Sequence, residues 1–242
     1  MAILDIEAVI FDWGGTLTPW HDIDLYGQWY AYAEVFDPVN AASLARKLTE
    51  AEKTRWQDQR NSSGGSSAGA LDSIFLEFGI DITGVAHLRA LSVYLDFWAP
   101  HTLAYPDAIE LFRGLRTDGL RIGILSNTLW PRNHHFEVFE RDNLAEFIDA
   151  AAYTSEMTVA KPHSEAFRSI ARSLGTTTLQ SVFVGDRIWE DIHGSQQVGM
   201  KAIWIPHSTI PDVEAVHTKT VPDAIAYELI EVLEIVRRWR AG

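Results

Sequence analysis

A single carboxylate, Asp12, stands at the end of the first apolar run of the chain and is followed at once by a glycine-rich turn. An acid at the carboxyl end of a buried strand, just before a sharp turn, is typical of the place where an open α/β sheet builds a site. Gly14 and Gly15 allow backbone groups to approach a bound anion closely, and Thr16 adds a hydroxyl. These residue types favour a nucleophile over a salt-bridge partner at position 12.

Four further apolar runs follow the first one, and together they predict a parallel sheet. Stretches with helical periodicity separate the later four runs, which is the arrangement of βαβ units. The predicted strands cover residues 8–11, 121–125, 147–153, 181–184 and 201–205. The clearest helices of this part are predicted over residues 106–115, 163–171 and 222–240. The pattern therefore indicates an α/β fold.

The interval between the first two predicted strands differs from the rest, because it carries helical patterns and no convincing strand. Helices are predicted there over residues 24–36, 38–60, 70–78 and 84–98. An all-helical stretch at this place predicts an insertion over the site, so we expect a core of residues 1–17 and 101–242 and a lid of residues 18–100. The Gly/Ser-rich residues 61–69 indicate a flexible segment, either a mobile surface loop or a loop that orders over a substrate.

The charge and composition of the chain narrow the classes of partner. Its 20 basic and 33 acidic residues give a net charge of −13, which argues against nucleic acid or an anionic membrane as the main partner. The absence of cysteine excludes disulfides and thiolate metal sites. No apolar run approaches the ~18 residues of a membrane span, and the first residues lack a signal-peptide pattern, so we expect a cytoplasmic protein. Both a monomer and a homodimer remain open.

Polar residues also follow three of the later predicted strands. Ser126 and Asn127 offer a hydroxyl and an amide to ligand oxygens, although a simple turn explains such a pair equally well. Lys161, just before a predicted helix, can direct an ammonium at developing negative charge, although an isolated lysine is usually a surface residue. Asp186 and Asp191 suit a hard cation such as Mg²⁺, although Asp186 can also be read as a helix N-cap.

All four clusters lie at the carboxyl ends of successive predicted strands, where an open parallel sheet brings them together. Their order, written D…SN…K…GDxxxxD, resembles that of the haloacid dehalogenase (HAD) superfamily of hydrolases. The resemblance covers nearly the whole chain, since the predicted helical insertion stands where that superfamily places a cap. It implies a Rossmann-like, three-layer α/β/α core with an inserted all-helical cap domain.

The resemblance also implies a role for each residue of these clusters. Asp12 would be a nucleophile that forms an aspartyl-phosphate, and the protein a Mg²⁺-dependent phosphatase of a small phosphorylated or other anionic substrate. The residues expected at the transferred group are Gly15, Thr16, Ser126, Asn127 and Lys161. The residues expected at the metal are Asp12, the Gly14 carbonyl, Asp186 and Asp191.

Position 14 departs from the phosphatase pattern, because family phosphatases carry a second acid there that protonates the leaving alcohol and later activates water. Gly14 cannot transfer a proton, and positioned acid–base catalysis is worth roughly 10²–10⁴-fold in rate. One interpretation is a phosphatase that borrows its acid from His21, Asp22 or Asp24, or that acts on substrates with a good leaving group. A second is a dehalogenase-like hydrolase, and a third is a weakly catalytic protein that binds a phosphorylated ligand or a partner.

Overall fold

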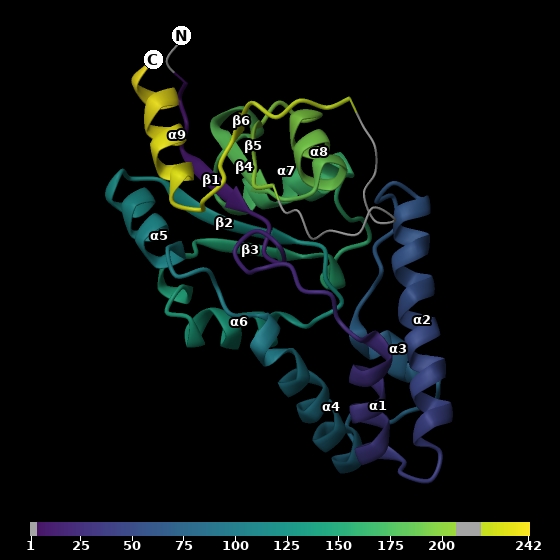
Figure 1. Ribbon diagram of the computed structural model, residues 1–242. Helices are drawn as coiled ribbons and strands as arrows, with labels where there is room; N and C mark the ends of the chain where they lie inside the picture. Colours follow the sequence, from purple (N-terminus) through teal and green to yellow (C-terminus); the bar gives the residue numbers. More distant parts are fainter. Residues whose placement is uncertain (1–3, 207–218) are drawn as a thin grey trace.

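Six parallel strands form one sheet with the order β3-β2-β1-β4-β5-β6 (Figure 1). The computed structural model describes residues 4–206 and 219–242. The strands are β1 (Ala8–Phe11), β2 (Arg121–Ser126), β3 (Ala150–Tyr153), β4 (Ser181–Gly185), β5 (Lys201–Trp204) and β6 (Ala224–Ile225). The chain passes from β1 to β2 on one side and later places β4 on the other, so the strand order reverses at β1. The carboxyl end of such a reversal is where open α/β sheets bind ligands.

Helices cover both faces of the sheet and confirm the predicted three-layer α/β fold (Figure 1). One face is covered by α5 (Ala108–Thr117), α6 (Arg132–Arg141) and α9 (Glu231–Ala241). The other face is covered by α7 (Ser164–Ser173) and the short α8 (Gly194–Gln196). Alternate residues of the buried β1 divide between the two layers: Val9 and Phe11 pack in the first core, and Ala8 and Ile10 in the second.

Four of the helices that lie between β1 and β2 in the sequence pack together at one end of the molecule (Figure 1). They are α1 (Leu25–Phe36), α2 (Ala41–Asn61), α3 (Leu71–Glu77) and α4 (Val85–Trp98), and we call them the helical lobe. Trp29, Tyr32 and Tyr94 are fully buried at its centre, with the Trp29 and Tyr94 rings 4.7 Å apart. The predicted all-helical insertion is thus present, and Asp24 begins it by accepting a hydrogen bond from the Gly27 amide.

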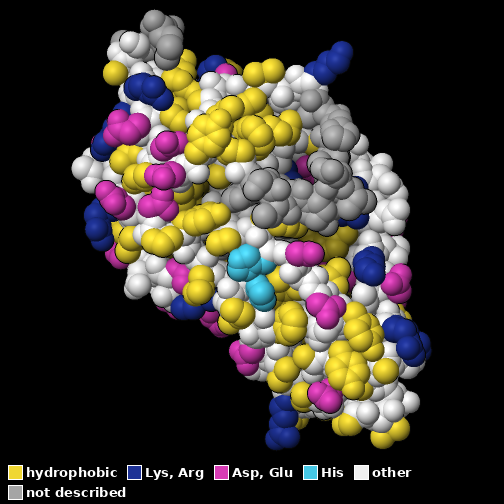
Figure 2. Space-filling view, viewed as in Figure 1, with side chains coloured by type: hydrophobic (Ala, Val, Ile, Leu, Met, Phe, Trp, Pro, Cys, Tyr) yellow, Lys and Arg dark blue, Asp and Glu magenta, His cyan; other side chains and the backbone are white. Residues whose placement is uncertain are grey.

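The surface mixes the classes of side chain. On the face shown in Figure 2, hydrophobic side chains lie over both the sheet domain and the helical lobe, with acidic and basic side chains dispersed among them. Among residues 4–206 and 219–242, no helix combines the length and the apolar character that crossing a membrane requires.

Strand β3 is shorter than predicted, because its predicted first residues form a turn. The amides of Phe147 and Ile148 donate to Leu144 and Ala145 and close a 3₁₀ turn at residues 145–147. The chain becomes extended only afterwards, and the β3 pairing with β2 begins at Ala150. The apolar run therefore marks a buried segment correctly but does not distinguish its turn from its strand.

The C-terminal segment also differs from the prediction of one helix over residues 222–240. Residues 224–225 form β6 instead, and the Asp223 and Ala226 amides donate to Ala202 and Trp204 of β5. The helix begins only at Glu231. This pairing provides hydrogen-bond donors for backbone carbonyls at the edge of β5. The periodicity of residues 222–240 alone does not reveal it.

The Gly/Ser-rich residues 61–69, predicted to be flexible, are hydrogen-bonded to the sheet domain. The Gly64 carbonyl accepts from the Ala160 amide at 2.8 Å, and the Ser67 amide donates to the Thr158 carbonyl at 3.0 Å. We call this pair of contacts the clasp. It connects the end of α2 to the loop directly before Lys161.

Gly64 is expected to be the most constrained residue of the clasp. Its φ is +76°, and a Cβ there would lie 2.4 Å from the Ala160 carbonyl oxygen. Gly79 is a matched control, because its φ is +69° and a Cβ there meets nothing within 4 Å. Both alanine variants incur about 1–2 kcal/mol of left-handed strain. Urea unfolding should show a further loss of about 1 kcal/mol or more for Gly64→Ala alone, and equal losses would contradict the clasp.

Candidate active site

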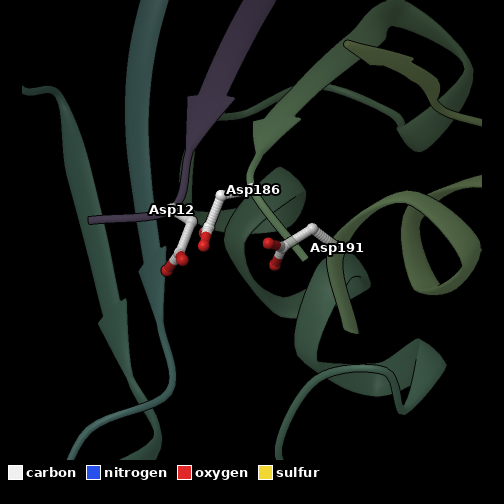
Figure 3. Close-up of side chains that lie close together, drawn as sticks. All are labelled: Asp12, Asp186 and Asp191. Atoms are coloured by element: carbon white, nitrogen blue, oxygen red, sulfur yellow. The ribbon is translucent and has the colours of Figure 1, made fainter. Parts of the chain in front are cut away.

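Asp12 lies where β1 ends, beside the end of β4. Its amide donates to the Val184 carbonyl at 2.9 Å, which continues the β1–β4 pairing by one residue. Asp186 directly follows β4, and Asp191 lies in the π-helical turn Ile188–His193 that comes next. Figure 3 shows the three carboxylates directed into the same space. The sheet thus brings together acids that lie far apart in the sequence.

The three carboxylates are buried and lie close enough together to hold a metal ion. One oxygen from each of Asp12, Asp186 and Asp191 lies within 4.8 Å of the others. Asp186 Oδ1 accepts a hydrogen bond from Thr16 Oγ1 at 3.1 Å. Asp186 Oδ2 is buried and has no hydrogen-bond partner among the residues that the structure describes, with Arg187 Nε 3.7 Å away. An all-oxygen donor set with one unsatisfied buried oxygen fits a hard divalent cation.

The electrostatics of the three carboxylates also favour a bound cation. Burial raises the pKa of Asp186 well above its usual range, and the neighbouring Asp191 and Asp12 raise it further, against the opposing effect of Arg187. Burial also raises the pKa of Asp191 to about 7, although Lys161 opposes the shift. So much negative charge in a buried space disfavours full ionisation of the carboxylates unless a cation is present.

Lys161 supplies one fixed positive charge beside the candidate nucleophile. Its Nζ lies 2.7 Å from Asp12 Oδ1 and 2.7 Å from Asp191 Oδ1, and its side chain is only 2% exposed. Burial acts to lower the pKa of Lys161, but the charges and hydrogen bonds of the two carboxylates outweigh it and raise the pKa above its usual range. The ammonium therefore stays charged next to Asp12.

Asn127 positions Lys161 through its backbone. Asn127 Nδ2 donates to the Lys161 carbonyl at 3.1 Å, and the Lys161 amide donates to Asn127 Oδ1 at 3.0 Å. The side chain predicted to meet a ligand is thus already engaged on both of its polar atoms. Thr16, also predicted at the ligand, is fully buried and donates to Asp186.

The two glycines of the turn after Asp12 have different surroundings. Gly15 has φ +86°, and a Cβ there would lie 2.6 Å from Asp186 Oδ2. A Cβ on Gly14 would meet nothing within 4 Å. Gly15 is therefore required for close approach of the turn to Asp186, whereas the position of the missing second acid has open space beside it.

A cavity of about 400 Å³ opens above these groups, between the sheet domain and the helical lobe. Seven of the predicted site residues line this cavity: Asp12, Gly14, Gly15, Ser126, Asn127, Lys161 and Asp191. His21 and Asp22 also line it, whereas Asp24 caps α1. The helical lobe contributes residues that sequence reasoning missed, namely Glu52, Trp56, Gln59, Arg60 and Trp98. The only local signal for them is the spacing of Glu52 and Trp56, which places both on one face of α2.

Comparison with known proteins identifies the family. Residues 6–199 match the sequence profile of haloacid dehalogenase-like hydrolases. The chain belongs to this family. It is 28% identical over 233 residues to a glyceraldehyde 3-phosphate phosphatase of Methanopyrus kandleri, and the match covers 96% of this chain and 97% of that protein.

Solved structures of the family share the fold. A HAD phosphatase from Thermococcus onnurineus superposes with a TM-score of 0.66 at 21% identity, covering 96% of this chain and 98% of that one. An L-2-haloacid dehalogenase from Xanthobacter autotrophicus gives a TM-score of 0.61 at 20% identity, with the same coverage of 96% and 98%. The fold is therefore common to phosphatases and dehalogenases, and the chemistry has to be argued from the site.

Substitution of Gly15 is expected to weaken divalent-metal binding. In Gly15→Ala the methyl group and Asp186 Oδ2 cannot both keep their places, so Asp186 must move. We expect a loss of about 10–100-fold in affinity, measured by calorimetric titration with Mg²⁺. Gly14→Ala adds the same methyl group to open space and should lose at least several-fold less; equal losses in the two variants would argue against Asp186 as a ligand.

Proposed function

We propose that this HAD-like hydrolase is a Mg²⁺-dependent phosphatase that acts on a small phosphorylated metabolite. The observation that carries the proposal is the buried group of Asp12, Asp186 and Asp191, with Asp186 Oδ2 left unsatisfied within the described part of the chain. Such a group fits a phosphatase better than a dehalogenase-like hydrolase, since displacement of a halide needs no metal. The glyceraldehyde 3-phosphate phosphatases among its relatives support the same reaction class.

In this proposal the helical lobe acts as a cap. The cap would comprise residues 18–100, and the catalytic core residues 1–17 and 101–242. The cavity between the two units supports this division, because its lining comes from both of them. Closure over a substrate would exclude bulk water and let cap residues recognise the leaving group.

The residues of the site then divide the work of phosphoryl transfer. An Asp12 carboxylate oxygen attacks phosphorus in line, the bond to the leaving oxygen breaks, and an aspartyl-phosphate forms. The Ser126 hydroxyl and the Lys161 ammonium hold the phosphate oxygens and offset their charge. Asp12, Asp186 and the Gly14 carbonyl would hold Mg²⁺, with Asp191 in support, and the bound ion would reduce repulsion between the two anions. Water then hydrolyses the acyl-phosphate and regenerates Asp12.

Asp12→Asn is expected to abolish hydrolysis of p-nitrophenyl phosphate. The amide is a poor nucleophile, so kcat should fall by at least ~10³-fold. Chelation by EDTA should remove the activity of the unaltered protein, and Mg²⁺ should restore it. Asp72→Asn, a change of the same kind at an exposed residue of α3, controls for the substitution. Activity that persists in Asp12→Asn, or in excess chelator, would contradict the proposal. Halide release from a 2-haloacid would instead favour a dehalogenase-like hydrolase.

The absence of an acid–base side chain at Gly14 predicts a second kinetic property. p-Nitrophenolate leaves without protonation, whereas attack of water on the aspartyl-phosphate lacks a base at this position. Rapid mixing should therefore reveal a burst of about one equivalent of p-nitrophenolate before slower steady turnover. Linear release from the first turnover would mean that another group activates the water.

A further inference from the structure

The cavity beside Asp12 is unusually rich in tryptophan. Five indole side chains line it, and they come from both the sheet domain and the helical lobe: Trp13, Trp20, Trp56, Trp98 and Trp130. Aromatic side chains that line a cavity favour flat apolar ligands and those that present a π-face. A short polar metabolite gains little from such a lining.

Three of these rings form a continuous group across the junction of the two units. The ring centroids of Trp13 and Trp130 are 5.5 Å apart, and those of Trp98 and Trp130 are 5.1 Å apart. Trp13 is the residue next to the nucleophile, and Trp98 ends α4 of the helical lobe. The aromatic group therefore extends from the reacting group to the cap, with Trp13 and Trp130 each 7% exposed.

A fourth ring, Trp56 of α2, is held in place from behind. Its Nε1 donates to Glu52 Oε1 at 3.3 Å, while Glu52 Oε2 accepts from Trp29 Nε1 at 2.6 Å and from Gln28 Nε2 at 3.1 Å. Glu52 is 5% exposed, so a buried acceptor fixes the N–H edge of a ring that lines the cavity. Such pre-organisation lowers the ordering cost of binding a ligand against that ring.

The leaving group is restricted independently by Gly14. An alkoxide is a poor leaving group and needs a proton as the phosphorus–oxygen bond breaks, but no side chain stands at position 14 to supply one. A phenolate is far more stable and leaves unprotonated. The missing proton donor at position 14 and the aromatic lining therefore favour the same class of substrate, namely esters that release a phenolate.

We propose that the substrate is an aryl phosphate, a phosphate monoester of an aromatic hydroxyl group; this rests on the proposed phosphatase function. Asp12 attacks phosphorus, the bond between phosphorus and the aryl oxygen breaks, and its electron pair leaves on the phenolate. The phenolate takes a proton from solvent. Water then cleaves the aspartyl-phosphate, which yields inorganic phosphate and the free Asp12 carboxylate.

Three esters, assayed with the unaltered protein, separate the effect of the aromatic ring from the effect of the leaving group. Phenyl phosphate has both an aromatic ring and a good leaving group, benzyl phosphate keeps only the ring, and cyclohexylmethyl phosphate has neither. We expect kcat/KM for phenyl phosphate to exceed that for benzyl phosphate by ~10²-fold or more. Benzyl phosphate should exceed cyclohexylmethyl phosphate by about 3–10-fold, because only its ring has a π-face.

Two variants test the roles of Gly14 and Trp56. For each variant the measured quantity is the ratio of kcat/KM between two esters, so that a general loss of activity cancels. Gly14→Asp places an acid in open space and should raise the benzyl-to-phenyl ratio at least ~10-fold. Trp56→Leu should bring the benzyl-to-cyclohexylmethyl ratio close to one. Trp189→Leu removes an indole stacked on His193 instead, and should leave that second ratio unchanged.

The outcomes distinguish this inference from the function on which it rests. Turnover of glyceraldehyde 3-phosphate with a kcat/KM above that of phenyl phosphate would overturn the aryl-phosphate class alone. A benzyl-to-cyclohexylmethyl ratio of one or less in the unaltered protein would do the same. Failure of every ester, with no turnover that depends on Asp12, would overturn the phosphatase function itself.

Discussion

The ion pairs of Lys161 with Asp12 and Asp191 are the interaction on which the rest of the site depends. Three carboxylates share a buried space, and an uncompensated buried charge is costly. One ammonium at 2.7 Å from two of them offsets part of that cost, whereas Asp186 Oδ2 has no hydrogen-bond partner within the described residues. The backbone of Lys161 is itself bound by Asn127, so the charge is held beside the Asp12 carboxylate.

The same lysine lies beside the contact between the two halves of the molecule. The clasp joins Gly64 and Ser67 of the helical lobe to Ala160 and Thr158, immediately before Lys161. A movement of the helical lobe would therefore shift the loop that precedes Lys161. The clasp therefore links the helical lobe directly to the loop that precedes Lys161.

The sequence was a good guide wherever the constraint is local. The predicted site residues converge because each follows a strand of one parallel sheet, and that edge is shared. It was a poor guide where distant segments decide the outcome. Residues 224–225 form a strand because β5 offers an edge, and residues 61–69 are held in part by the loop before Lys161, which pairs with them. The pairing of Glu52 and Trp56 at the cavity likewise depends on how α2 packs, which spacing alone does not settle.

Fold similarity does not choose the chemistry, since a phosphatase and a dehalogenase superpose almost equally well on this chain. The decision falls to two local features that act on different steps. The buried carboxylate group bears on what can bind, because Asp186 Oδ2 has no hydrogen-bond partner within the described residues and, in the proposed function, would contact a metal. Gly14 bears on what can leave, because position 14 itself carries no proton donor, although His21 and Asp22 also line the cavity. Under the proposed function, a site that has the carboxylate group but no acid at position 14 would favour substrates that depart as stable anions, and the tryptophans that line the cavity would bind them.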